Sequence, residues 1–185
     1  AFNEKYNNKF IVINQENGNL PSNDVRCVAV DNRNQLWIGT FTGLRIINSI
    51  DRFITETELT STNIVIQEGD LAQELFYQQV IQDIKVDGSN NKWVAIADAG
   101  VFQVSPNGQT TIRRFTKENS PLPSNNVLDI EIDEVSGEVF FATDKGLVSY
   151  LGSSTKGDDT LENVYVYPNP VRPGYTGTVK ISGLM

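Results

Sequence analysis

The sequence contains no histidine, one cysteine and no long apolar run, and each of these absences excludes a class of function. Without histidine, the chain lacks the usual general base near neutral pH and the commonest ligand of transition metals. No apolar stretch approaches the roughly 18 residues of a membrane-spanning helix, so we expect no transmembrane segment. The single cysteine, Cys27, excludes an internal disulfide, and its alternating surroundings predict a buried, unreactive side chain.

Positive charge is scarce as well. The 185 residues include 15 Lys and Arg against 23 Asp and Glu, which gives a net charge of -8. Such a charge would repel phosphate backbones, so we expect no nucleic acid among the partners. The first residues are charged and amide-rich and do not resemble a secretory signal, so we expect that a signal was removed or that the chain is a fragment.

What the sequence does contain is a repeat. The run Leu-Pro-Ser-Asn-Asp-Val at 20–25 returns at 122–127 as Leu-Pro-Ser-Asn-Asn-Val. Each copy leads into a β-branched run that ends in an aspartate, and a middle copy keeps only this second part. The three marker aspartates, Asp31, Asp87 and Asp133, lie 56 and 46 residues apart. These separations are close to the roughly 40–50 residues of a β-propeller blade.

Each repeat predicts three or four antiparallel strands. A polar turn after the aspartate is followed by an aromatic strand at 36–40, 92–96 and 139–143, and a turn ending in glycine opens a third strand. Segments 9–13 and 110–115 have the β-branched content of a fourth, outer strand. Four antiparallel strands per unit describe a propeller blade. We predict that the large side chains of Trp37, Trp93 and Phe140 are wedged between neighbouring blades.

The succession Leu-Pro-Ser-Asn-x-Val, Asp, Leu-Trp-Ile-Gly-Thr and Gly-Leu resembles the two-component-regulator propeller repeat over roughly residues 9–150. This resemblance implies a propeller and a location outside the cytoplasm, but it does not name a ligand. Three blades cannot close a ring, because propellers have four to eight. We therefore expect the other propeller blades of a larger, intact protein among the partners.

Residues 151–162 are small and polar and predict a linker, and 163–185 predict two strands of a C-terminal β-sandwich domain. The run Tyr-Pro-Asn-Pro-Val at 167–171 resembles the opening of the C-terminal domains of type IX secretion cargo and of PorZ-type proteins, in which regulator-type blades precede such a domain. The resemblance implies a non-enzymatic component of a cell-surface attachment complex, which handles anionic lipopolysaccharide and works with other secretion-complex proteins, the sortase subunit among them. The predicted fold class is all-β, with about three blades of an incomplete propeller followed by the start of a sandwich.

An insertion between residues 47 and 80 interrupts the second repeat. Asp70, with Gln73 three residues later, has the pattern of a helix N-cap and predicts a short helix. Insertions into a regular repeat tend to carry function. The speculative binding residues are therefore Asp70, Glu74, Phe76 and Tyr77. The alternative is a cap over the blade edge, with Leu71, Leu75 and Phe76 packed inward.

Other polar features point to structure more than to chemistry. Residues 31–35 and 87–91 resemble the start of a calcium loop, but the twelfth positions are Thr42 and Asp98 instead of glutamate, which favours Asp/Asn hairpin turns. The Arg113-Arg114 pair could attract an anion or be merely solvated. We predict no catalytic residues, no metal site, no cofactor and no enzyme activity. The alternative function is the periplasmic sensing propeller of a hybrid two-component sensor kinase, which would bind a glycan; a propeller enzyme using carboxylates is a weaker third.

Overall fold

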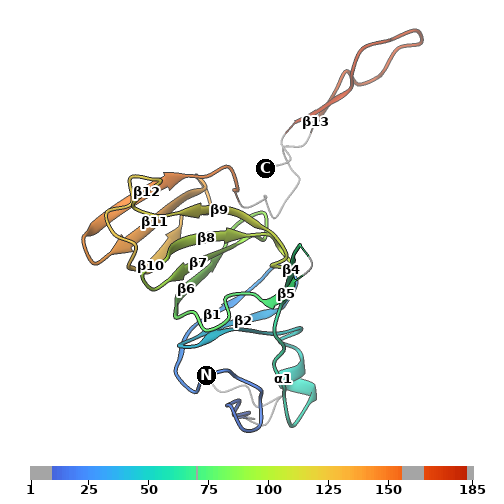
Figure 1. The fold of residues 1–185 in the computed structure, drawn as a ribbon. Helices are drawn as coiled ribbons and strands as arrows, with labels where there is room; N and C mark the ends of the chain where they lie inside the picture. Colours follow the sequence, from blue (N-terminus) through green and yellow to red (C-terminus); the bar gives the residue numbers. More distant parts are fainter. Residues whose placement is uncertain (1–9, 70, 156–164, 183–185) are drawn as a thin grey trace, which may run out of the picture.

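The computed structural model describes residues 10–69, 71–155 and 165–182. Three antiparallel sheets follow one another along the chain and correspond to the predicted blades (Figure 1). Blade 1 contains β1 (Val25–Val30), β2 (Leu36–Thr40) and β3 (Gly43–Ile47). Blade 2 contains β6 (Ile81–Val86), β7 (Lys92–Ile96), β8 (Gly100–Val104) and β9 (Thr111–Phe115). Blade 3 contains β10 (Val127–Ile132), β11 (Glu138–Thr143) and β12 (Gly146–Leu151). The predicted all-β fold class is confirmed.

The three blades share their register as well as their strand order. In each blade the first strand is bulged at the same place, between Val25 and Cys27, between Ile81 and Asp83, and between Val127 and Asp129. A bulge shifts the pairing of the strand that carries it by one residue. Because the shift occurs at the same step in all three blades, the flanking positions are equivalent. Each residue of one blade can therefore be compared with its counterpart in the next.

The marker aspartates close the first hairpin turn of the blades. One carboxylate oxygen of Asp31 accepts hydrogen bonds from the backbone N–H groups of Arg33 and Gln35, both at 2.9 Å. The other oxygen accepts the indole N–H of Trp37 at 3.3 Å. In blade 2, Asp87 likewise accepts two backbone N–H groups and the indole N–H of Trp93, the latter at 3.1 Å. The carboxylates of these two turns thus accept hydrogen bonds from the protein itself, as expected of hairpin turns.

The core lies between the blades. Trp37 and Leu44 of blade 1 form one buried cluster with side chains of the next blade and of the insertion: Ile81, Ile84, Val94, Ile96, Ile64 and Leu75. Trp93 of blade 2 forms the second cluster with Val127, Ile130, Val139 and Phe141 of blade 3. Phe140, the counterpart of the two tryptophans, is half-buried and lies outside both clusters. It holds the register position at which Trp37 and Trp93 pack against the following blade.

Two predicted elements differ in the structure. Segment 110–115 forms the fourth strand of blade 2, β9, but residues 10–14 form no strand. Instead, Ile13 packs on a small cluster of Leu20, Ile38 and Ile47. The second difference concerns the insertion and is described below. A short helix, α1 (Arg52–Thr55), follows blade 1.

The C-terminal part contains β13 (Tyr165–Tyr167) and β14 (Lys180–Ser182), which pair antiparallel as two strands joined by a long turn. Most of the predicted linker, and the ends of the predicted sandwich segment, lie outside the described residues. Among the described residues, no helix has the length and apolar character needed to cross a membrane.

Candidate functional site

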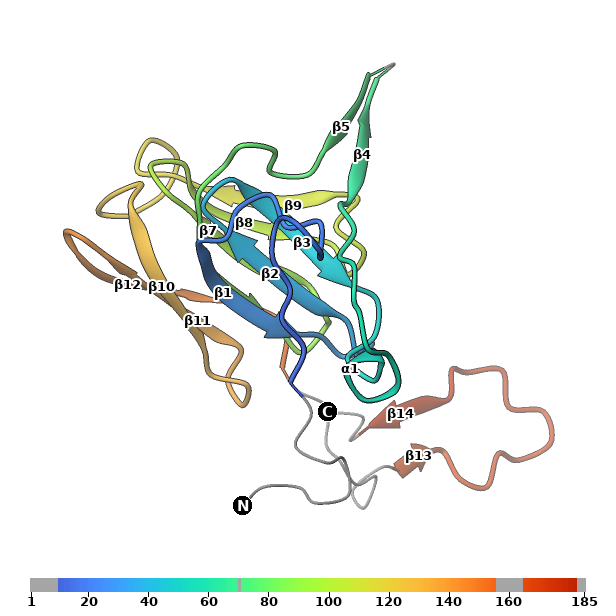
Figure 2. The ribbon, with the colours of Figure 1, turned by 90° about the horizontal axis from the view of Figure 1, so that it is seen from below.

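The insertion folds as a β-hairpin and not as the predicted helix. Strands β4 (Val65–Glu68) and β5 (Leu71–Glu74) pair antiparallel and stand away from the blades (Figure 2). The helix prediction was wrong because two other local preferences favour a hairpin. The β-branched pair Val65-Ile66 favours a strand. Gly69, with a φ of 62°, favours the tight turn that follows, and the capping pattern does not reveal either preference. Asp70 lies outside the described residues. Of the side chains expected to pack inward, Leu75 and Phe76 do so, whereas Leu71 is 75% exposed.

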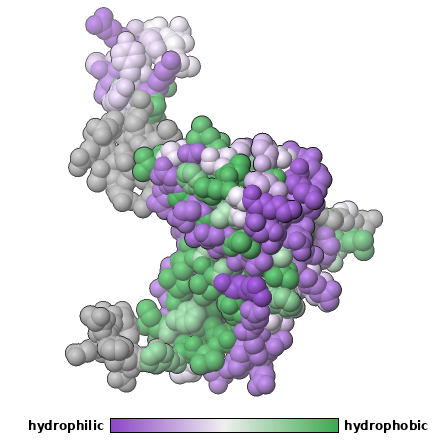
Figure 3. All heavy atoms as spheres, turned by 90° about the vertical axis from the view of Figure 1, so that its left-hand side faces the viewer, coloured by the Kyte–Doolittle hydropathy of each residue, from purple (hydrophilic) through white to green (hydrophobic). Residues whose placement is uncertain are grey.

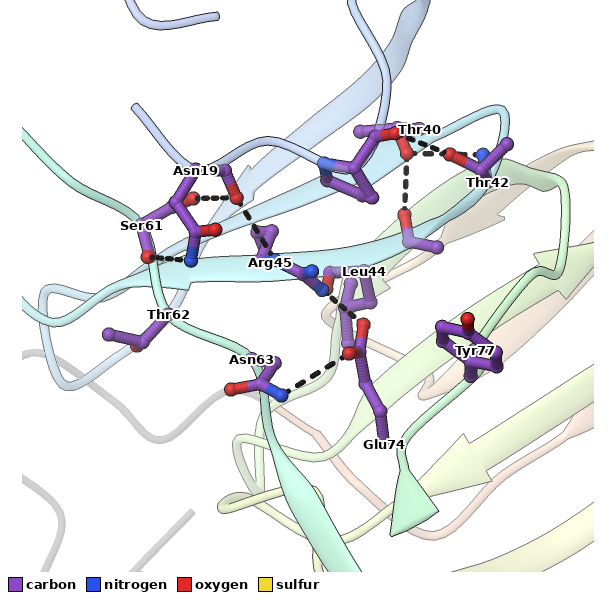
Figure 4. Close-up of polar contacts among 12 residues, drawn as sticks. Asn19, Thr40, Thr42, Leu44, Arg45, Ser61, Thr62, Asn63, Glu74 and Tyr77 are labelled. Atoms are coloured by element: carbon purple, nitrogen blue, oxygen red, sulfur yellow. Dashed lines mark hydrogen bonds and ion pairs between the residues drawn. The ribbon is translucent and has the colours of Figure 1, made fainter. Parts of the chain in front are cut away.

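A polar cluster fastens the hairpin to blade 1 (Figure 4). The Arg45 guanidinium forms an ion pair with Glu74 and donates hydrogen bonds to the carbonyl oxygens of Leu44 and Asn19, at 2.8 and 3.1 Å. Asn63 donates to the second Glu74 oxygen at 3.2 Å. Both charged side chains are mostly buried. The predicted binding residue Glu74 therefore stabilises the hairpin through this ion pair.

This cluster stands where blade 2 has its outer strand. In the described part of blade 1, β3 is paired on its outer side only at Ile46, whose N–H and carbonyl group exchange 2.8 Å hydrogen bonds with Thr62. The carbonyl of Leu44 is instead satisfied by the Arg45 side chain. A buried polar group needs a partner, and here a side chain supplies it in place of a fourth strand. The insertion therefore does not add a fourth strand to blade 1, and its strands β4 and β5 pair with each other instead.

A groove of about 410 Å³ lies between the hairpin, residues 75–79 and blade 2. Its floor is apolar: the Phe76 ring meets the Phe102 ring edge-on, with 5.4 Å between centroids, beside Leu75 and Ile96. Its rim is polar and consists of Gln73, Gln79, Thr111, Arg114 and the exposed Tyr77. Of the four predicted binding residues, the structure brings Glu74, Phe76 and Tyr77 to this groove.

The charge of the groove comes from Arg114. Its guanidinium lies over the Phe102 ring, 4.9 Å from the centroid, and donates a long hydrogen bond of 3.4 Å to the Ala99 carbonyl. The Glu74 carboxylate is neutralised by Arg45. The site can therefore accept an anionic group beside an apolar one. Sequence reasoning noted Arg114 but did not place it near the insertion, because β9 and the hairpin are brought together only by the packing of successive blades.

The entry into blade 2 is also unusual. Phe76 and Gln78 have φ values of 57° and 56°, in the left-handed region that side chains with a Cβ disfavour. In the first and third repeats this place is held by the Leu-Pro-Ser-Asn run, whose leucines are buried. The loss of that run in the second repeat thus coincides with a strained turn that leaves Tyr77 exposed beside the groove.

Cys27 is not part of a reactive site. The predicted burial of Cys27 is only partial in the structure. This partial burial and the nearby Asp83 carboxylate raise the pKa of its thiol to about 12. We expect Cys27 of the folded protein to react with iodoacetamide at pH 8 at least about 100-fold more slowly than free cysteine, because almost no thiolate is present. Alkylation followed by mass spectrometry measures this rate, and the protein unfolded in urea is the control. Equal rates in the two states would contradict the assignment.

The comparisons with known proteins agree with this architecture. Residues 19–42 match the family model of the two-component regulator propeller. The structure is similar to PorZ, an essential bacterial surface component of the type-IX secretion system of Porphyromonas gingivalis, with 31% identity over 86% of this chain and 22% of that chain, and a TM-score of 0.67. No curated protein matches the chain significantly.

Two further solved structures share the fold. They are the extracellular domains of the putative hybrid two-component systems BT3049 and BT4673 from B. thetaiotaomicron. The first is 24% identical over 75% of this chain and 17% of that chain, with a TM-score of 0.54. The second is 19% identical over 85% of this chain and 22% of that chain, with a TM-score of 0.55. The chain spans about a fifth of the length of these proteins and of PorZ.

The fold defines the chain as a set of β-propeller blades, and residues 19–42 of the first blade match the regulator-type repeat. Within this class, the chain is similar to the PorZ structure. Both predicted resemblances, to the regulator repeat and to PorZ-type proteins, are confirmed.

Proposed function

We propose that the chain is a non-catalytic binding and scaffold segment of an extracytoplasmic propeller protein, a PorZ-like component of a type IX secretion attachment complex at the cell surface. The observation that carries the proposal is the 31% identity to PorZ over 86% of the chain, in a shared fold. The order of the parts, with regulator-type blades before the Tyr-Pro-Asn-Pro-Val segment, supports it. The partners in this function are secretion-complex proteins or a lipopolysaccharide or other glycan, and the chain acts by binding and not by catalysis.

The exposed outer face of blade 1 is consistent with a propeller that has further blades. Ile81 and Ile84 of blade 2, and Val127 and Ile130 of blade 3, are at most 1% exposed because the preceding blade covers them. Their counterparts in blade 1, Val25 and Val28, are 43% and 58% exposed. Apolar side chains gather on the lower half of the body in Figure 3, where Figure 1 places β1 and β2. Contiguous exposed apolar surface of this kind marks an interaction site.

The outer face of blade 3 shows the same disparity. Leu44 and Val101 are buried by the blade that follows, whereas their counterpart Leu147 is 68% exposed. Asp83 of blade 2 accepts the backbone N–H of Ile130 in blade 3 at 2.9 Å. Its counterpart Asp129 is exposed, and its carboxylate accepts no hydrogen bond from the described residues, so a following blade could donate to it in the same way. Both faces therefore fit further blades of the same repeat.

Fractionation of the source cells tests the proposed location. The intact protein is expected in the outer-membrane fraction, and an external protease that cannot enter the cell should cleave it. An inner-membrane protein would be the matching control, since it should stay intact. Recovery of the protein in the inner membrane, in one polypeptide with a kinase, would contradict the proposal in favour of a hybrid two-component sensor.

A further inference from the structure

At the groove and beyond it, one face of the hairpin carries two aliphatic side chains, Ile66 and Leu71. In the hairpin register Ile66 is opposite Gln73, and Leu71 lies two residues from Gln73, so the three side chains project from one face. Ile66 and Gln73 line the groove. Leu71, farther along the same face, is 75% exposed. A separation of two residues along a strand extends the surface by roughly 7 Å.

The backbone of the hairpin is also open to a partner. Strands β4 and β5 form a sheet of two among the described residues, so each has an outer edge without a neighbouring strand. A two-stranded sheet is marginally stable in water, and an added strand would stabilise it. Unpaired edges of this kind accept extended peptides, with backbone hydrogen bonds providing affinity and side-chain pockets providing specificity.

The polar groups of the rim have spare hydrogen-bonding capacity. The side-chain amides of Gln73 and Gln79 form no hydrogen bond with the part of the chain that the structure describes, and Arg114 forms no ion pair with it. Glu74, the acidic residue beside them, is already paired with Arg45. An incoming carboxylate would thus meet an uncompensated guanidinium.

We propose that this surface binds an extended segment of a partner polypeptide, which packs an aliphatic side chain on Ile66 and Leu71 and places a carboxylate at Arg114. A peptide fits this surface because Ile66 and Leu71 can contact an aliphatic side chain, and because the outer edges of β4 and β5 can pair with an extended backbone, which a saccharide lacks. The inference deepens the proposed binding function, on which it rests, by naming the chemistry of one partner.

A phage-displayed library of random 12-residue peptides, selected on the intact protein, tests the proposal. Enriched peptides are expected to combine an acidic residue with an aliphatic one. Leu71→Asp and Arg114→Glu should each weaken their binding at least about 10-fold, because each removes a central contact. The matched controls are Val135→Asp, at a residue that is 87% exposed in blade 3, and Arg33→Glu, at an exposed turn of blade 1. Both should bind as the unchanged protein does.

Enriched peptides that bind the two groove variants as tightly as the unchanged protein would overturn the proposal, and so would a selection without enrichment. Binding of acidic oligosaccharides that depends on Arg114, with no peptide bound, would assign the groove to a saccharide instead. Thermal unfolding shows whether each variant is folded, and Leu71→Ser replaces Leu71→Asp if it is not. Peptide binding and cell-surface location are measured separately, so either proposal can fail alone.

Discussion

Replacement of Lys92 by methionine is expected to lower the free energy of unfolding by about 3–5 kcal/mol. The Lys92 side chain is fully buried between blades 1 and 2. Its ammonium group donates to Asp31 at 2.7 Å and to the carbonyl oxygens of Asn90 and Pro106, both at 2.9 Å, and lies 4.6 Å from the centre of the Trp37 ring. Methionine fills the space but leaves the Asp31 carboxylate buried without its counter-ion.

The electrostatics of the pair explain the size of this effect. Burial lowers the pKa of Lys92, and the hydrogen bond and charge of Asp31 only partly offset it. Burial opposes ionisation of Asp31, yet the hydrogen bonds from Lys92 and from two backbone N–H groups outweigh it and lower the pKa of this carboxyl. Each charge thus depends on the other. Loss of one partner of such a buried pair costs much more than the net contribution of the pair to stability.

Chemical denaturation of the intact protein measures the change, with Lys85→Met as the matched control. Lys85 pairs with Glu131 at 3.1 Å across blades 2 and 3, but both side chains are substantially exposed. Its removal should cost at most about 1 kcal/mol. The double variant with Asp31→Asn should be more stable than Lys92→Met alone, because the unpaired charge is gone. Equal effects of Lys92→Met and Lys85→Met would refute the buried-pair interpretation.

The blades could be predicted from the sequence because each blade repeats the same local chemistry. An aspartate that closes a turn and accepts a tryptophan N–H six residues later makes register a local property, and it recurs in blades 1 and 2. Lys92 escaped prediction because its role is not local. It occupies the strand position of Leu36 and Val139 in the other blades. A lysine at this apolar position was the signal in the sequence that a buried charge needs a partner.

The candidate site could be predicted only in part. The broken repeat directed attention to the insertion, and Phe76 and Tyr77 line the groove beside it. The helix expected there was wrong because a capping pattern over four residues competes with hairpin formation, which cross-strand pairing decides. Phe102 and Arg114 come from a different blade, so only the packing of blade 2 against the insertion brings them to the same groove.

Replacement of Leu147 by alanine is expected to destabilise the intact protein by about 2–5 kcal/mol, as much as the same change at Leu44. Leu44 is 1% exposed because blade 2 covers it, while Leu147 occupies the equivalent position and is 68% exposed in the part of the chain that the structure describes. If a further blade packs there, the two leucines lose equivalent contacts when they are shortened. If the face is open to water, Leu147→Ala should change stability by no more than about 0.5 kcal/mol.

Hydrogen exchange of peptides from β11 and β12, combined with denaturation of the intact protein, distinguishes these cases. Exchange is needed because it reports on β12 itself, whereas a protein with more than one domain need not unfold in one step. Val135→Ala, at the exposed turn of blade 3, is the negative control and should leave both measurements unchanged. Loss of protection in β12 after Leu147→Ala would mean that blade 3 has a neighbour on this side. A silent Leu147→Ala beside a costly Leu44→Ala would mean that the stack ends at blade 3, and the chain would then have to present that apolar face to a different partner.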